Sequence, residues 1–356
     1  MSLPATMRAV LLTGNGGFDK LEFRDDVPVP HPGPGEVLVR VGAAGVNNTD
    51  INTRIGWYSK AVAEATEVGG TTGIAGSEDD GWSGAAFSFP RIQGADACGR
   101  IVAVGAGVDP ARIGERVLVE PVFRGSSRFD ARYFGSEVDG SFADFVRVPS
   151  LHAHRIECAL TDVELASFPC AYSAAENMLT RIALTAGEHV LITGASGGVG
   201  SAAVQLAKRR GAHVTAMAGA DKADAVRALG ADRVIPRDAD LAALFGDEAF
   251  DAAVDIVGGG QFSAILGALK RGGRYGVAGA ISGPVVDLDL RTLYLKDLRL
   301  LGCTILDQGV FANLIGYIER GEIGPLVAAT YPLAEIVAAQ QAFLTKHHVG
   351  KIVLTL

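Results

Sequence analysis

The chain has 356 residues, of which 48% are hydrophobic and 20% charged, which is enough apolar material for two packed domains of roughly 150 residues each. A net charge of −8 and an isoelectric point near 5.4 disfavour a nucleic-acid partner, because such partners select basic surfaces. No apolar run reaches the ~18 residues of a membrane span, and the start, MSLPATMRAV, lacks the apolar segment of a secretory signal, so we expect a cytoplasmic protein.

Short apolar segments separated by Gly/Pro turns form the first part of the chain. The segments MRAVLLT, VLVRVGAAGV, IVAVGAGV and ERVLVEP predict β-strands. Between Tyr58 and Pro90 the sequence is rich in Gly, Ser and Thr and has no clear period, which predicts a long inserted loop.

From about Leu160 the pattern changes to strands that alternate with helices. ELASFPCAYSAAENML predicts a helix, and HVLITG, HVTAMAG, RVIP, AFDAAVDIVG and RYGVAG predict strands with amphipathic helices between them. This alternation predicts βαβ units and a parallel sheet. The segment LYLKDLRLLGCTIL is also apolar and predicts a further strand. The closing helix PLAEIVAAQQAFL and strand GKIVLTL are expected to return to the first domain.

The strongest local signal is a glycine-rich turn between an apolar strand and a helix, in HVLITGASGGVGSAAVQLAKRRGAHV. Gly197 lets the backbone approach a pyrophosphate, Gly200 allows close packing of helix and strand, and the helix N-terminus offers free N–H groups to phosphates. The turn matches a dinucleotide fingerprint with Ala195 at the first glycine position. A tight turn without any ligand is the alternative. The predicted contacts in the turn are Ala195, Ser196, Gly197, Gly198, Val199 and Gly200.

The residues after the second strand of this unit predict NADPH as the cofactor. Binders of NAD usually carry Asp or Glu there for the ribose 2′-hydroxyl, whereas this chain has Ala218 followed by Gly219. The small side chains leave room for a 2′-phosphate, and Lys222 and Arg237 can supply cations. Both cations could instead be solvated surface charges, and Asp221 could serve the 2′-hydroxyl of NAD.

Over nearly its whole length the chain resembles the quinone oxidoreductase (zeta-crystallin-like) branch of the medium-chain dehydrogenase/reductase superfamily. The motifs PHPGPGEVLVRV, GVNNTDINTRIGWY, IQGADACGRIVAVGAGV, ITGASGGVGSAAVQLAK and GKIVLTL carry the resemblance. The resemblance implies an α/β protein with a GroES-like β-rich catalytic domain over residues 1–158 and 318–356 and a Rossmann dinucleotide-binding domain over 159–317. Val257, Gly279 and Lys351 complete the expected contacts with the cofactor.

The same resemblance predicts that the chain has lost its metal sites. Zinc-dependent relatives carry a Cys ligand where this chain has Asn47, and a His followed by Glu where it has Ala95 and Asp96. Cys170 stands at the third ligand position, but a single thiolate cannot hold zinc. The four-cysteine structural zinc loop is missing as well. The remaining cysteines and the histidine pairs 152/154 and 347/348 are expected to be structural or exposed.

Without zinc, the resemblance implies NADPH-dependent reduction of a quinone or an α,β-unsaturated carbonyl, a small-molecule substrate. The candidate catalytic residues are Asn47, as a hydrogen-bond donor to a carbonyl oxygen, Tyr58, as a proton donor or cleft residue, Asp50 and Arg54. Asp50 could instead cap a helix and Arg54 could be structural.

Two alternatives to this reading remain open. One is an alcohol dehydrogenase whose metal site uses ligands other than those of the family. The other is a catalytically silent protein that binds NADPH. A homodimer is also expected, because relatives pair the strand that matches LYLKDLRLLGCTIL across an interface.

Overall fold

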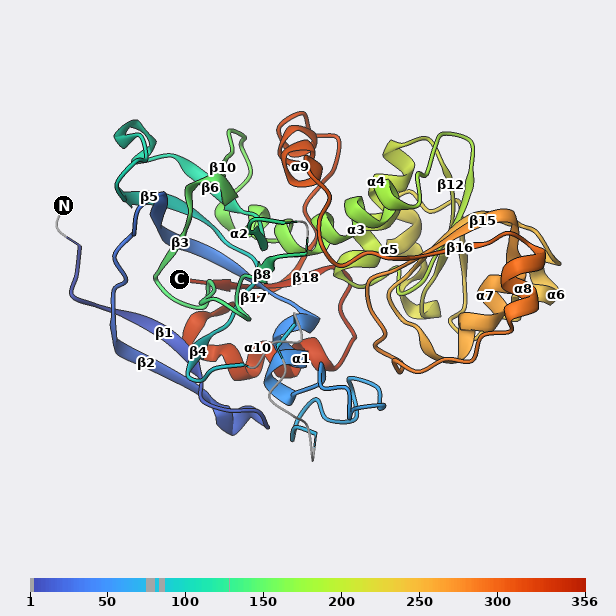
Figure 1. Ribbon diagram of the computed structural model, residues 1–356, viewed down its shortest axis with the longest axis horizontal. Helices are drawn as coiled ribbons and strands as arrows, with labels where there is room; N and C mark the ends of the chain where they lie inside the picture. The colour runs from blue at the N-terminus through green and yellow to red at the C-terminus, as the bar shows by residue number, and fades with distance from the viewer. Residues whose placement is uncertain (1–2, 75–80, 83–86, 128) are drawn as a thin grey trace.

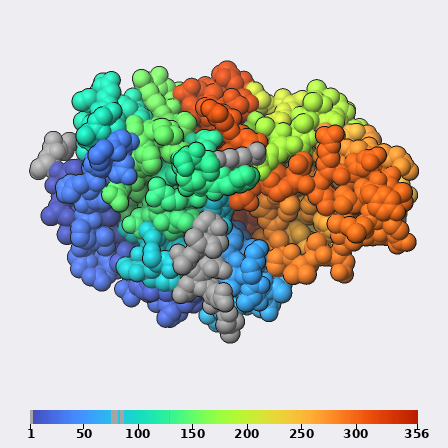
Figure 2. Space-filling view, in the orientation of Figure 1, coloured from blue at the N-terminus to red at the C-terminus, as the bar shows by residue number. Residues whose placement is uncertain are grey.

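The computed structural model describes residues 3–74, 81–82, 87–127 and 129–356, which form two domains placed side by side along the long axis of the molecule (Figure 1). The space-filling view shows that the domains meet near the middle, where the surface is hollowed between them (Figure 2).

The first domain is β-rich and uses both ends of the described chain. Its main sheet has the strand order β10-β6-β5-β3-β18-β17, with β9 also paired to β3, and smaller sheets are formed by β2-β1-β4 and β7-β8. Its elements are β1 Thr6–Leu12, β2 Leu21–Pro28, β3 Glu36–Val46, α1 Asn48–Ile55, β4 Arg91–Ile92, β5 Cys98–Val104, β6 Arg116–Val119, β7 Val122–Arg124, β8 Ala131–Tyr133, β9 Phe145–Pro149, β10 Ala153–Arg155, α2 Asp162–Leu165, β17 Val327–Pro332, α10 Ile336–Leu344 and β18 Lys351–Thr355.

The second domain is a parallel six-stranded sheet with the order β13-β12-β11-β14-β15-β16. In chain order this is 3-2-1-4-5-6, the doubly wound Rossmann order, which leaves a crevice between β11 and β14 where the winding reverses. Its elements are α3 Pro169–Arg181, β11 His189–Ile192, α4 Gly198–Arg209, β12 His213–Met217, α5 Ala223–Ala228, β13 Arg233–Ile235, α6 Leu241–Phe245, β14 Phe250–Asp255, α7 Phe262–Ala268, β15 Leu269–Val277, α8 Leu290–Leu295, β16 Arg299–Gly302 and α9 Val310–Glu319. The predicted Rossmann sheet is confirmed.

The central strand β11 of this parallel sheet is covered on both faces, which explains its continuous apolar run from Val190 to Ile192. Val190 and Ile192 of β11 belong to the core beneath α3, α4 and α9, whereas Leu191 faces the core beneath α6 and α7. Successive side chains of a strand point to opposite faces, so a strand covered on both sides carries no polar positions.

The chain crosses between the domains twice, and the first crossing lies later than the predicted boundary at residue 158. Helix α2 contacts β3, β5 and β18 of the first domain, whereas α3 packs on α4 and α9 of the second. The passage therefore falls between these two helices. The chain returns after α9, which ends at Glu319.

The segment LYLKDLRLLGCTIL is only partly a strand, and the prediction over its full length was wrong. Helix α8 occupies Leu290–Leu295, because Asp289 accepts a hydrogen bond from the backbone N–H of Arg291 at 2.9 Å and so starts a helix. Strand β16 covers only Arg299–Gly302, and it lies at the edge of the sheet.

No described helix is both long and apolar enough to cross a membrane. The cysteines at positions 98, 158, 170 and 303 are all free thiols, and those at 98 and 303 are buried.

Candidate active site

The glycine-rich turn has the geometry of a dinucleotide cradle. A Cβ on Gly200 would stand 2.2 Å from the carbonyl oxygen of Gly194, so only glycine lets α4 begin this close to β11. At Gly197 the nearest atom to such a Cβ would be 3.5 Å away, so this side of the turn is open. The first-turn N–H groups at Gly198, Val199 and Gly200 have no acceptor within the helix and can bind phosphate oxygens.

Other predicted cofactor residues shape this crevice. Ala195 is fully buried and donates its N–H to the carbonyl of Met217 at 3.1 Å, so it shapes the turn from below. The carbonyl of Ser196 accepts the N–H of Gly350 at 3.0 Å and ties the turn to the first domain.

Val257 and Gly279 lie across the crevice from the turn. The Cγ2 atom of Val257 is 3.2 Å from the place of a Cβ on Gly194. A Cβ on Gly279 would stand 2.9 Å from the carbonyl oxygen of Ile256, so this position suits glycine.

A buried carboxylate fixes the strand ends around the crevice. Asp255, at the end of β14, accepts hydrogen bonds from Thr193 Oγ1 at 2.6 Å, from the backbone N–H groups of Val257 and Gly258 at 2.8 and 3.1 Å, and from the hydroxyl of Tyr275 at 2.5 Å. These donors come from the ends of β11, β14 and β15, so one side chain holds the crevice open in a fixed shape.

Cationic side chains converge beyond Gly219, on the side where an adenosine ribose would lie. Lys222 is only 4% exposed and donates to the carbonyl of Lys346, and Arg237 lies with Nη2 3.5 Å from the place of a Cβ on Gly219. Burial and neighbouring cations, Lys222 among them, lower the pKa of Lys346 to about 8 and that of His348 to about 4.

These cations have few acidic partners. Asp221 raises the pKa of Lys222, and Glu67 raises that of Lys346, but burial outweighs both effects. Within the described part of the chain, the buried Nδ1 of His348 has no hydrogen-bond partner. A polyanionic ligand would relieve the repulsion between these cations and would give the His348 ring nitrogen a hydrogen-bond partner.

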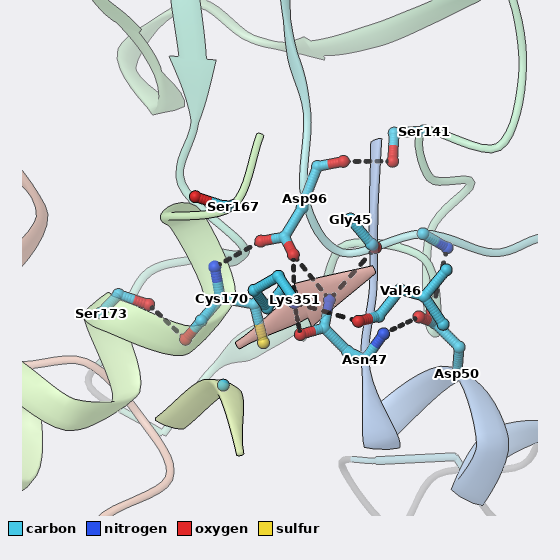
Figure 3. A network of polar contacts seen from close by, with 12 residues as sticks. Gly45, Val46, Asn47, Asp50, Asp96, Ser141, Ser167, Cys170, Ser173 and Lys351 are labelled. Atoms are coloured by element: carbon cyan, nitrogen blue, oxygen red, sulfur yellow. Dashed lines mark hydrogen bonds and ion pairs between the residues drawn. The ribbon is translucent and has the colours of Figure 1, made fainter. Parts of the chain in front are cut away.

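A polar cluster under the turn joins Asn47, Asp96, Cys170 and Lys351 (Figure 3). The ammonium of Lys351 forms an ion pair with Asp96 Oδ2 at 2.8 Å, donates to the carbonyl of Val46 at 3.1 Å and donates to Asn47 Oδ1. The amide of Asn47 donates to Asp96 Oδ2 at 2.8 Å, and the backbone N–H of Cys170 donates to Asp96 Oδ1 at 2.5 Å.

This cluster changes the predicted roles of Asn47 and Lys351. Both amide hydrogens of Asn47 are engaged, by Asp96 and by the carbonyl of Gly45 at 3.3 Å, so Asn47 has no donor left for a substrate carbonyl. The ammonium of Lys351 has three hydrogens and three protein acceptors. Only its methylene chain touches the turn, with Cδ 3.0 Å from the place of a Cβ on Gly198.

Asp50 has a capping role, which was one of the two roles considered for it. Its carboxylate accepts the N–H of Asn47 at 2.7 Å at the start of α1 and the N–H of Gly94 at 3.2 Å. Burial raises its pKa to about 7, against the lowering effect of these hydrogen bonds and of Lys351. Asp50 thus holds Asn47 in place.

Arg54 has a structural role rather than the predicted catalytic one. It is fully buried and donates to Gln340 Oε1 at 2.9 Å and to the carbonyls of Gly16 and Gly70 at 2.8 and 2.6 Å. Its guanidinium also lies over the ring of Phe18 at 4.4 Å. These contacts tie α1 to α10 and to the insert, and the full burial of Arg54 keeps its guanidinium away from a substrate.

Next to the cluster lies a buried apolar contact between the two domains. Val122 and Tyr133 of the first domain pack with Leu306 and Val310 of the second. Trp82, from the insert between Tyr58 and Pro90, lies against Tyr133 with ring centroids 4.9 Å apart. The insert therefore packs against this contact.

Hydroxyl groups gather beside Cys170, at the edge of this apolar contact. Tyr133 OH lies 2.9 Å from Cys170 Sγ, and Thr49 interacts with the hydroxyls of both Tyr133 and Tyr58. Burial raises the pKa of both tyrosines, so both stay protonated at neutral pH. Of the predicted catalytic set, Tyr58 therefore places its hydroxyl in this group.

The described residues do not fit a zinc ion. Among them, no three His, Cys, Asp or Glu side chains are arranged to hold a metal. Burial and the charge of Asp96 raise the pKa of Cys170 to about 12, and its Sγ lies 2.9 Å from Tyr133 OH. One cysteine alone cannot hold zinc. His152 and His154 both bind Glu120 Oε2, at 3.2 and 3.1 Å, and so act as structural partners of that carboxylate.

Sequence reasoning missed Thr49, Tyr133, Lys346 and Asp255. Thr49 lies inside the motif GVNNTD and could have been found there. Tyr133 and Lys346 lie in segments without a recognisable motif, and only the tertiary fold brings them to the crevice.

Comparison with known families matches both domains of the chain. The alcohol dehydrogenase GroES-like domain matches residues 33–157, and the family described as zinc-binding dehydrogenase matches residues 198–320.

Three relatives match almost the whole chain. A solved structure from Sinorhizobium meliloti 1021, provisionally assigned as an alcohol dehydrogenase, is 46% identical, covers 99% of this chain and 97% of its own, and has a TM-score of 0.90. Acryloyl-coenzyme A reductase of Metallosphaera sedula is 28% identical over 98% of this chain and 100% of its own length. Quinone oxidoreductase of Lama guanicoe is 28% identical over 98% of both.

Proposed function

Because this chain belongs to the medium-chain dehydrogenase/reductase superfamily, in its quinone oxidoreductase-like branch, we propose that it reduces a quinone or an α,β-unsaturated carbonyl with NADPH and without zinc. Membership makes it an NAD(P)H-dependent oxidoreductase. The choice of NADPH, the substrate class and the absence of zinc are the proposal.

One observation carries the proposal: three hydroxyl groups gather beside Cys170, next to the positions where zinc-dependent relatives are expected to carry ligands. Thr49, Tyr58 and Tyr133 lie there, while Asn47 is bound to Asp96 and Lys351. Without a Lewis acid, simple alcohols are poor substrates, because nothing lowers the pKa of the alcohol. A conjugated acceptor needs only positioning and a donor to its oxygen.

Bound NADPH would supply the hydride, and the protein would supply a donor and a proton. The hydroxyls of Tyr133 and Tyr58 can donate to the carbonyl oxygen as negative charge develops on it. Hydride addition to the conjugated bond would leave an enolate, which would take up a proton at the carbon next to the carbonyl. One tyrosine hydroxyl of this group, with Thr49 between the two tyrosines, would give that proton, and the tyrosinate would regain one from solvent.

The group of cations beyond Gly219 supports NADPH over NADH. Lys222, Lys346 and Arg237 together offer the positive charge that a 2′-phosphate needs, in a place where NAD would present only a hydroxyl. Asp221 is the residue that would favour NAD.

The names of two relatives support the reaction class. One is an acryloyl-coenzyme A reductase and the other a quinone oxidoreductase. The relative provisionally assigned as an alcohol dehydrogenase favours a metal-dependent alternative. Oxidation of NADPH should be followed in a chelator with simple enones, quinones and enoyl thioesters, with a saturated ketone as control. Reduction of NADP⁺ by a primary alcohol, with and without added Zn²⁺, is the second control.

The outcome of this assay separates the three functions. Turnover confined to the conjugated acceptors supports the proposal. Turnover only of the alcohol, and only with added metal, would favour the metal-dependent alternative. Tight NADPH binding with no turnover of any compound would favour a catalytically silent protein.

We also propose a homodimer formed at the edge of the Rossmann sheet. Strand β16 is an edge strand, and the exposed apolar side chains Leu290, Tyr294, Leu295 and Leu300 lie on it and on α8. An open edge with apolar side chains invites pairing with a second copy.

A further inference from the structure

The centre of the cluster in Figure 3 is a positive charge that belongs to the protein itself. Asn47, Asp96 and Cys170, from three separate segments, meet around the ammonium of Lys351. These three residues stand at, or next to, the positions where the sequence comparison with zinc-dependent relatives expects ligands. The lysine comes from β18, 304 positions along the chain from Asn47.

The ammonium satisfies the demands that a metal ion would meet in such a site. Asp96 is fully buried, and a nearby cation offsets the cost of burying its charge. Lys351, itself 3% exposed, supplies one positive charge that balances the one negative charge of Asp96. Its three ammonium hydrogens all bind oxygen atoms of the cluster. Each of these oxygen atoms therefore receives a hydrogen bond from the ammonium.

The same contacts leave no room for a divalent ion. Oδ2 of Asp96 is bound to Lys351 and Asn47, and Oδ1 is bound to the N–H of Cys170. A second cation would stand within a few ångströms of the ammonium and repel it in a dry environment. The sulfur of Cys170 is engaged with Tyr133 OH at 2.9 Å.

We propose that the Lys351 ammonium is the resident cation of this site: it takes the place of a metal ion and keeps divalent metals out. This extends the metal-free part of the proposed function by naming the residue responsible. The metal-exclusion proposal does not involve the substrate, so it is tested by measuring the metal content of the protein. The proposed function is tested separately, by measuring turnover.

The test adds the missing metal ligand to the site in two forms of the protein, one that keeps the Lys351 ammonium and one that lacks it. Asn47→Cys adds a thiolate beside Asp96 and Cys170, which together make the three protein ligands that a catalytic zinc needs. We compare N47C, N47C/K351M and N47C/K351R after incubation with Zn²⁺ and gel filtration. Zinc is measured by elemental analysis, and Co²⁺ replaces it to reveal thiolate-to-metal absorption.

The expected result is about one zinc per chain in N47C/K351M and less than about a tenth of that in N47C and N47C/K351R. The cobalt absorption should appear only in the variant without the ammonium. Equal uptake by N47C would overturn the proposal, because a retained lysine would then not exclude metal. No uptake by folded N47C/K351M would overturn it as well.

Folding is controlled separately, since loss of Lys351 leaves Asp96 unpaired. D96N/K351M removes both charges and should fold without metal. If N47C/K351M folds only when Zn²⁺ is present, as judged by thermal unfolding, the metal has replaced the ammonium, as proposed. If it stays unfolded with Zn²⁺ while D96N/K351M folds, the site does not accept a metal in place of the lysine, and the proposal is wrong.

Discussion

Replacing Lys222 should separate the two nicotinamide cofactors. Lys222→Met keeps the apolar stem of this buried side chain and removes its ammonium. One ammonium hydrogen is donated to the carbonyl of Lys346, which leaves two for a 2′-phosphate. A hydrogen bond to a charged group contributes about 1.5–3 kcal/mol, so NADPH should bind about 10- to 150-fold more weakly. NADH, which has no 2′-phosphate, should bind within about twofold of its original affinity.

The assay is a fluorescence titration of both cofactors, with thermal unfolding to show that the variant is folded. Arg237→Ala removes a second cation of the same group for comparison; because Arg237 is exposed, its loss should weaken NADPH binding by only about 0–1 kcal/mol. Asp221→Asn tests the competing role of the carboxylate. An equal loss of affinity for NADH and NADPH in K222M, or tighter binding of NADH by the unaltered protein, would refute the reasoning.

The pKa of Lys346 adds a pH dependence to the same contact. Burial lowers this pKa to about 8 in the free protein, so the side chain is charged below that pH and neutral above it. A bound phosphate favours the charged form and raises the pKa, so protons are taken up on binding near pH 8. Affinity for NADPH should therefore fall as the pH rises through about 8, while affinity for NADH stays level. Calorimetry in buffers of different ionisation enthalpy measures the uptake, and its absence would remove Lys346 from the phosphate site.

The remaining predictions concern metal, catalysis, stability and assembly. The purified protein should contain no stoichiometric zinc and keep its activity in a chelator; one zinc per chain, lost together with activity, would contradict this. Of Tyr133→Phe and Tyr58→Phe, the variant that removes the proton donor should lower kcat by about 10²-fold or more with little change in cofactor affinity. A small effect of both variants would exclude both tyrosines as the proton donor. Arg54→Met should leave buried carbonyls unpaired at about 1–3 kcal/mol each and lower the Tm without changing the cofactor preference, with Arg54→Lys as a milder control. Light scattering should show a dimer that Leu300→Glu dissociates, and a monomeric unaltered protein at micromolar concentration would count against the interface.

The fold was predictable wherever one segment carries its own signal. The turn around Gly197 is recognisable because strand, turn and helix follow one another in the sequence, and the alternation of strands and helices fixes the parallel sheet. The segment from Leu293 to Leu306 misled us because Leu and Tyr suit a helix and a strand equally well. The capping residue Asp289, just outside the segment, decides between them.

The site was predictable only in part, because its side chains come from distant segments. Asn47 was predicted to donate to a substrate carbonyl and Lys351 to contact the cofactor, since the sequence does not reveal that both side chains bind Asp96. Arg54 looked like a free cation in a promising motif, yet its partners Gly16, Gly70 and Gln340 share no pattern with it. Pairings of this kind depend on tertiary structure and leave no local trace.

The place of β18 in the first sheet has a consequence for how the protein is made. This strand lies between β3 and β17, so the sheet stays interrupted until the ribosome has released residues 351–355. The Rossmann domain is contiguous and can fold while synthesis continues, because domains generally fold as units. During that interval the apolar edge of β3 has no partner. A nascent chain arrested just before Gly350 should therefore hold a folded nucleotide-binding half and an open, chaperone-binding remainder.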